Sequence, residues 1–70
     1  MLRQGDQAPC IAAVKRRLQV FPVDMTFDSL LAQRVRGIQL VHGIPTSGVL
    51  DAETAEAAGV AHLIEVRSWI

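Results

Sequence analysis

One stretch of this 70-residue chain decides its fold, because one helix ends there and another begins: His42-Gly43-Ile44-Pro45-Thr46-Ser47-Gly48-Val49-Leu50-Asp51-Ala52-Glu53-Thr54. Gly43 can adopt the left-handed conformation that ends a helix, and Pro45 cannot continue one. Asp51 is a good N-cap, and residues 52–58 favour a helix that Gly59 ends. The stretch therefore predicts two helices joined by a compact turn.

Upstream of this turn, the sequence predicts a helix that begins at Asp28 or Ser29 and ends near His42. Either Asp28 or Ser29 can cap the free N–H groups of its first turn. Its inward face is an apolar stripe at helical spacing, made by Leu31, Val35 and Ile38.

The first helix is predicted over residues 9–20. Pro9 suits the first helical position, and Pro22 ends the helix. Its apolar stripe recurs at steps of three and four and consists of Ile11, Val14, Leu18 and Phe21. The residues expected mainly outside the stripe are Lys15, Arg16 and Gln19. Three helices with compact connections predict a single all-α domain, a three-helix bundle over residues 1–59.

Residues 60–70 follow another pattern. Ile64, Val66 and Ile70 alternate with other residue types, which indicates an extended strand, with a short helix as the alternative. A single strand needs a sheet edge or a second chain to pair with. These residues are therefore predicted to form a C-terminal interface arm whose contacts to a partner are made by Leu63, Ile64, Val66, Trp69 and Ile70. For Trp69, packing back on the helical core of its own chain is the alternative.

The segments before the second and third helices show a weak internal repeat. Residues 24–28 (Asp-Met-Thr-Phe-Asp) parallel residues 47–51 (Ser-Gly-Val-Leu-Asp) at a spacing of 23 residues. Each segment brings two apolar positions and an aspartate cap ahead of a helix, which turn chemistry alone can also produce.

Composition argues against several classes of function. Seven Lys and Arg balance seven Asp and Glu, so the chain lacks the basic surplus typical of nucleic-acid binders. No apolar run is long enough to cross a membrane. Cys10 is the only cysteine, and we expect it to be buried as a small apolar residue. Half of the residues are hydrophobic and the mean hydropathy is +0.28, which indicates an apolar surface that serves as an interface.

Five spaced elements follow one another along residues 2–58: Leu2-Arg3-Gln4-Gly5-Asp6, Val14-Lys15-Arg16-Arg17-Leu18, Pro22-Val23-Asp24 with Phe27, Val35-Arg36-Gly37-Ile38-Gln39, and the turn quoted above. Together they resemble the peptidoglycan-binding domain family, a three-helix module appended to amidases, endolysins and spore-cortex hydrolases. The resemblance implies a three-helix fold that binds the cell wall without doing chemistry.

The first loop departs from the family pattern. Met25 and Asp28 stand where the family has glycine, and Leu31 replaces the threonine that opens its helix. Glycine at such positions allows a positive φ or a close approach of ligand to backbone. The loop is therefore expected to adopt another conformation or to have lost the ancestral ligand.

No catalytic, metal-binding or cofactor-binding set is predicted. Asp28 and Asp51 are interpreted as caps, and His42 as a residue at a helix C-terminus, where a partly positive imidazole is favourable. His62 is expected at the surface or in an interface.

A shallow ligand groove is predicted beside the altered loop, lined by Asp24, Phe27, Arg36 and Gln39. Phe27 also suits the core. Arg34 and Arg36 fit either a solvated helix face or contacts to the carboxylates of peptidoglycan stem peptides, for which guanidinium is suited.

Two functions remain open. The preferred one is a structural subunit of a larger assembly, such as a decoration protein of a phage virion, whose partner is another protein or a second copy. The alternative is a module that targets or tethers a partner to peptidoglycan. No targeting segment precedes the domain pattern, which predicts synthesis in the cytoplasm and arrival in a virion or at the cell wall after assembly or lysis.

Overall fold

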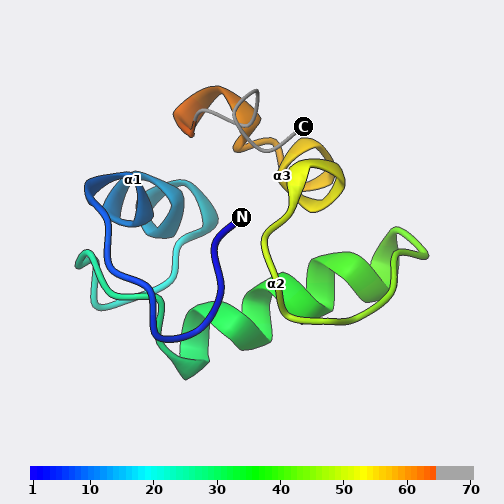
Figure 1. Cartoon of the computed structure of the whole chain (residues 1–70), viewed down its shortest axis with the longest axis horizontal. Helices are drawn as coiled ribbons and strands as arrows, with labels where there is room; N and C mark the ends of the chain where they lie inside the picture. The colour runs from blue at the N-terminus through cyan, green and yellow to red at the C-terminus, as the bar shows by residue number, and fades with distance from the viewer. Residues whose placement is uncertain (65–70) are drawn as a thin grey trace.

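The computed structural model describes residues 1–64, which fold into three helices and a short 3₁₀ turn. The elements are α1 (Pro9–Leu18), α2 (Ser29–Val41), α3 (Ala52–Ala58) and η1 (Ala61–Leu63). In Figure 1, α2 runs across the view while α1 and α3 lie above it and are seen nearly end-on. This arrangement confirms the all-α three-helix prediction. No helix among the described residues combines the length and apolarity that a membrane span requires.

The core lies where the three helices meet. Each helix contributes one buried face, as the apolar spacing predicts. The fully buried apolar side chains include Ile11 and Val14 from α1 and Leu31 and Val35 from α2, and those from elsewhere include Phe27, Leu50, Ala55 and Val60. Cys10 is half-buried and packs against this core, which agrees with its expected apolar role.

Residues 2–8, which we call the N-terminal arm, pair with the loops that precede α2 and α3. Leu2 and Leu50 exchange two backbone hydrogen bonds, with N···O distances of 3.1 and 2.7 Å. Further along, the N–H of Gly5 donates to the carbonyl of Phe27, and the N–H of Phe27 donates to Asp6. The arm therefore joins the beginnings of two helices that are far apart in sequence.

The 23-residue repeat is visible in the backbone. Asp28 accepts from the N–H of Leu31 at 3.0 Å, and Asp51 accepts from the N–H of Thr54 at 2.8 Å, so both are N-caps as predicted. Hydrogen bonds donated to these carboxylates lower the pKa of both aspartates. The donors to Asp28 are Lys15, with the larger effect, and the N–H of Leu31. The donor to Asp51 is Thr54.

Lys15 corrects the sequence prediction, because it lies inside the protein and has no exposed surface. Its Nζ donates to Asp24 at 2.6 Å, to Asp28 at 2.9 Å and to the carbonyl of Pro22 at 3.4 Å. Burial lowers the pKa of Lys15, but the hydrogen bonds that its ammonium donates to the two aspartates outweigh this effect and leave that pKa raised. Bonding to Lys15 is also the main reason that the pKa of each aspartate is lowered. The pair of carboxylates thus supplies the charge that a buried ammonium needs.

The first helix ends two residues earlier than predicted. Gln19 adopts a left-handed conformation with φ of 58°, and the N–H of Val20 then donates to the carbonyl of Lys15 at 2.9 Å. This turn places Val20 in the core and directs Phe21 outward, where 67% of its surface is exposed. The assignment of Phe21 to the buried stripe is therefore wrong, because the helical spacing stops before reaching it.

Gln39 holds α2 to the turn and to α3. Its side-chain N–H donates to the hydroxyl of Thr54 and to the carbonyl of Val49, both at 3.0 Å, and more weakly to Ser47. Its side-chain carbonyl accepts from the N–H of Gly48 at 3.0 Å. A buried amide with all of its groups paired fixes the turn that decides the fold.

The chain packs on its core beyond Gly59. Val60 is fully buried, η1 contacts both α1 and α3, and Ile64 is nearly buried. The core thus continues past the predicted domain boundary, and residues 61–63 form a 3₁₀ turn where an extended arm was expected. Ile64 has almost no surface left for the predicted partner contact. The other predicted contacts of that arm, apart from Leu63, lie outside the described residues.

Replacing the buried lysine tests the importance of its charge. Lys15→Met leaves two partly exposed aspartates beside an apolar side chain, and we expect the free energy of unfolding to fall by about 2 kcal/mol at pH 7. Urea denaturation measures this change.

The pH dependence gives a second readout of the same variant. The pKa values of Asp24 and Asp28 are lowered by folding, so their contribution is present above about pH 4 and is lost as the pH falls through their folded values. The difference between wild type and Lys15→Met should therefore shrink in acid. An equal difference at pH 7 and at about pH 2 would contradict this account.

Candidate functional site

An open groove lies between the end of α1 and the exposed face of α2. It has a volume of about 400 Å³. We call it the first groove, and its lining residues are Gln19, Val20, Phe21, Leu30, Gln33, Arg34 and Gly37.

Local structure explains how these residues come together. The α2 members occupy positions 30, 33, 34 and 37, a spacing of three and four that puts them on one helix face. Gly37 has no side chain to fill the groove, and the space that a Cβ atom would occupy there is open, with no atom of another element within 4 Å. The left-handed turn at Gln19 brings Phe21 to the opposite wall. The groove is therefore built by one helix face and one turn.

The groove offers an aromatic ring, two amides and a guanidinium. Phe21 and Leu30 are exposed apolar groups, and Gln33 and Arg34 are exposed donors beside them. Arg34 makes no ion pair with any of residues 1–64. An apolar surface with a few convergent polar groups is typical of a binding site for a small ligand or a segment of a polymer.

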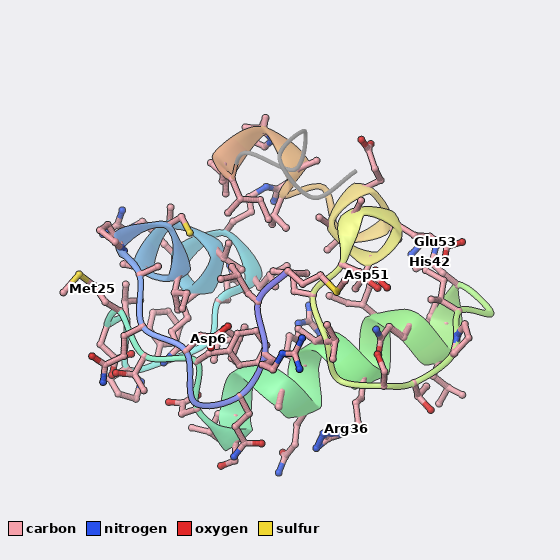
Figure 2. The ribbon with its side chains drawn as sticks, in the orientation of Figure 1. Asp6, Met25, Arg36, His42, Asp51 and Glu53 are labelled. Carbon is pink, nitrogen blue, oxygen red and sulfur yellow. The ribbon has the colours of Figure 1, made fainter. Side chains whose placement is uncertain are left out.

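The four residues predicted to line a ligand groove do not form one. Phe27 and Gln39 have no exposed surface, because the first fills the core and the second ties α2 to α3. Asp24 is held by Lys15. Arg36 is exposed, and in Figure 2 it projects from the side of α2 that faces away from α1.

Of the two phenylalanines, only Phe21 has a ring that is exposed to a ligand. Phe21 lies outside the core that its spacing predicts, whereas Phe27 fills the core, the alternative that the sequence also allows for it. The sequence does contain a signal, since Pro22 directly follows Phe21 and indicates that the chain has left the helix there. Arg34, considered for ligand contact, does line the first groove.

The histidines and the cysteine belong to no metal-binding group among the described residues. His42 is the C-cap of α2, as expected, and its side chain is exposed. Within residues 1–64 no group of three or more His, Cys, Asp or Glu side chains could hold a metal ion.

Comparison with known proteins identifies the module. Residues 9–58 match the family model of the peptidoglycan binding domain. The chain belongs to the peptidoglycan binding domain family. No curated protein and no solved structure matches the chain. The match spans α1, α2 and α3 and includes every residue of the first groove, so this peptidoglycan binding domain carries the groove within its family region.

The two phenylalanines make a matched pair for a stability test. Phe27→Ala removes a fully buried ring and should cost about 3–5 kcal/mol, enough to unfold much of so small a domain. Phe21→Ala removes a mostly exposed ring and should change stability by no more than about 0.5 kcal/mol. Thermal unfolding followed by circular dichroism measures both, and a similar loss in the two variants would refute the assignment.

Proposed function

We propose that this domain binds peptidoglycan and that the first groove holds a segment of the glycan chain. The observation that carries the proposal is the exposed ring of Phe21 beside Gln33 and Arg34, within the region that matches the peptidoglycan binding domain family. The role is one of attachment, in keeping with the binding character of the family.

The chemistry of the groove suits an N-acetylated sugar. The apolar C–H face of a pyranose ring packs against an aromatic ring, and Phe21 presents its ring to solvent. Hydroxyl and acetamido groups need donors and acceptors, which the side chains of Gln19, Gln33 and Arg34 supply. The open shape suits a polymer, because an open groove can hold one segment of a longer chain.

Retention on purified sacculi tests this function. Wild type should sediment with the sacculi, and Phe21→Ala should lose about fivefold or more in affinity, since an aromatic contact contributes about 1 kcal/mol. Met25→Ala is the control, because Met25 is also an exposed apolar residue and lies outside the first groove. Failure of wild type to bind, or equal losses in both variants, would contradict the proposal.

An assembly role is the second candidate. Leu40 and Val41, at the end of α2, are 73% and 82% exposed and lie outside the first groove. Adjacent exposed aliphatic residues favour contact with another protein surface. A structural subunit, such as the virion decoration protein considered from the sequence, would use this pair.

Native mass measurement tests the simplest assembly, a dimer of two copies of this chain. If the pair joins two copies of the chain, wild type should be dimeric and Leu40→Gln should shift the protein to monomer. A wild-type protein that is still monomeric at about 100 μM would have a dimer dissociation constant weaker than that concentration, which would count against self-assembly.

A further inference from the structure

A second groove lies on the other side of Gln19. It has a volume of about 480 Å³ and is lined by Ala13, Arg16, Arg17, Gln19 and Leu63. Gln19 lines both grooves, so the two form adjoining stretches of one surface around the end of α1.

Two elements build the second groove. Ala13 precedes Arg16 and Arg17 by three and four positions, which puts all three on one face of α1. Leu63 comes from η1, which contacts α1 and supplies the opposite wall. The guanidinium of Arg17 extends to within 3.9 Å of where a Cβ atom would stand at Gly59. The groove therefore lies where α1, the end of α3 and η1 meet, with η1 drawn in orange in Figure 1.

The second groove carries positive charge that the rest of the described chain does not neutralise. Arg16 and Arg17 are exposed, and neither makes an ion pair with any of residues 1–64. The two aspartates that follow α1, Asp24 and Asp28, are already bound to Lys15. Two guanidiniums beside the aliphatic side chains of Ala13 and Leu63 thus face solvent together.

We infer that the second groove binds the carboxylates of the peptidoglycan stem peptide. This inference rests on the proposed function, in which the first groove holds the glycan. A guanidinium presents two parallel donors that match a carboxylate, and Arg16 and Arg17 supply two such forks. Ala13 and Leu63 offer a small apolar surface for the methyl groups of alanine residues. A peptide branching from the sugar chain at Gln19 would enter this groove.

Basic residues in the last turn of a helix also favour the helix dipole. This interaction with the helix dipole stabilises the folded protein to the same extent whether or not the ligand carries a peptide. The test must therefore compare ligands that differ only in the peptide.

Calorimetric titration with soluble wall fragments provides this comparison. The full chain is titrated with glycan oligomers that carry stem peptides, with the same oligomers after an amidase has removed the peptides, and with peptide-bearing oligomers whose carboxyl groups have been converted to amides. Arg17→Gln is the variant. Arg3→Gln is the matched control, because it removes the same charge from an exposed arginine outside both grooves.

Wild type should bind the peptide-bearing oligomer about fivefold more tightly than the other two, the size of a good charged contact at a surface. Arg17→Gln should abolish this preference and leave the affinity for the bare glycan unchanged, while Arg3→Gln keeps the preference. Equal wild-type affinity for all three oligomers, or a preference that survives Arg17→Gln, would overturn the inference alone. Absence of binding to any oligomer would overturn the proposed function and this inference with it.

Discussion

A lysine ammonium without exposed surface must be neutralised inside the protein, and this requirement organises the region between α1 and α2. Lys15 leaves the face of α1 toward Asp24 and Asp28, so the loop between the helices has to fold back over the helix. Asp28 serves at the same time as the N-cap of α2. One cation thus fixes the path of the loop and the starting point of the next helix.

The same requirement explains the altered loop. The family pattern has glycine where this chain has Met25 and Asp28, yet Gln19 is the only described non-glycine residue with a positive φ. Met25 accepts a hydrogen bond from Ala8 through its carbonyl, and Asp28 binds Lys15. A backbone bond at Met25 and a side-chain bond at Asp28 therefore hold this loop in a conformation that needs no glycine, and the first groove lies next to it, around Phe21.

Local patterns predict this fold well because its signals are local. Helix periodicity, Asp28 and Asp51 as caps, and Gly43 and Gly59 at the ends are all readable within a few residues. The site is harder to predict, because exposure depends on where a helix stops. The left-handed conformation of Gln19 turns Phe21 out of the core, and burial of Lys15 depends on two aspartates whose approach only the folded loop reveals. The family resemblance predicted the three-helix module but gave no information on the turn at Gln19 or on the bonds of Lys15 to the two aspartates.

The N-terminal arm has a consequence for how the domain comes apart. It hydrogen-bonds to Phe27 in the first half of the repeat and to Leu50 in the second, and both residues are fully buried. Release of the whole arm would remove backbone hydrogen bonds from both halves at once, which couples their unfolding. Such coupling favours one cooperative transition, with the slowest amide exchange shared between the two halves.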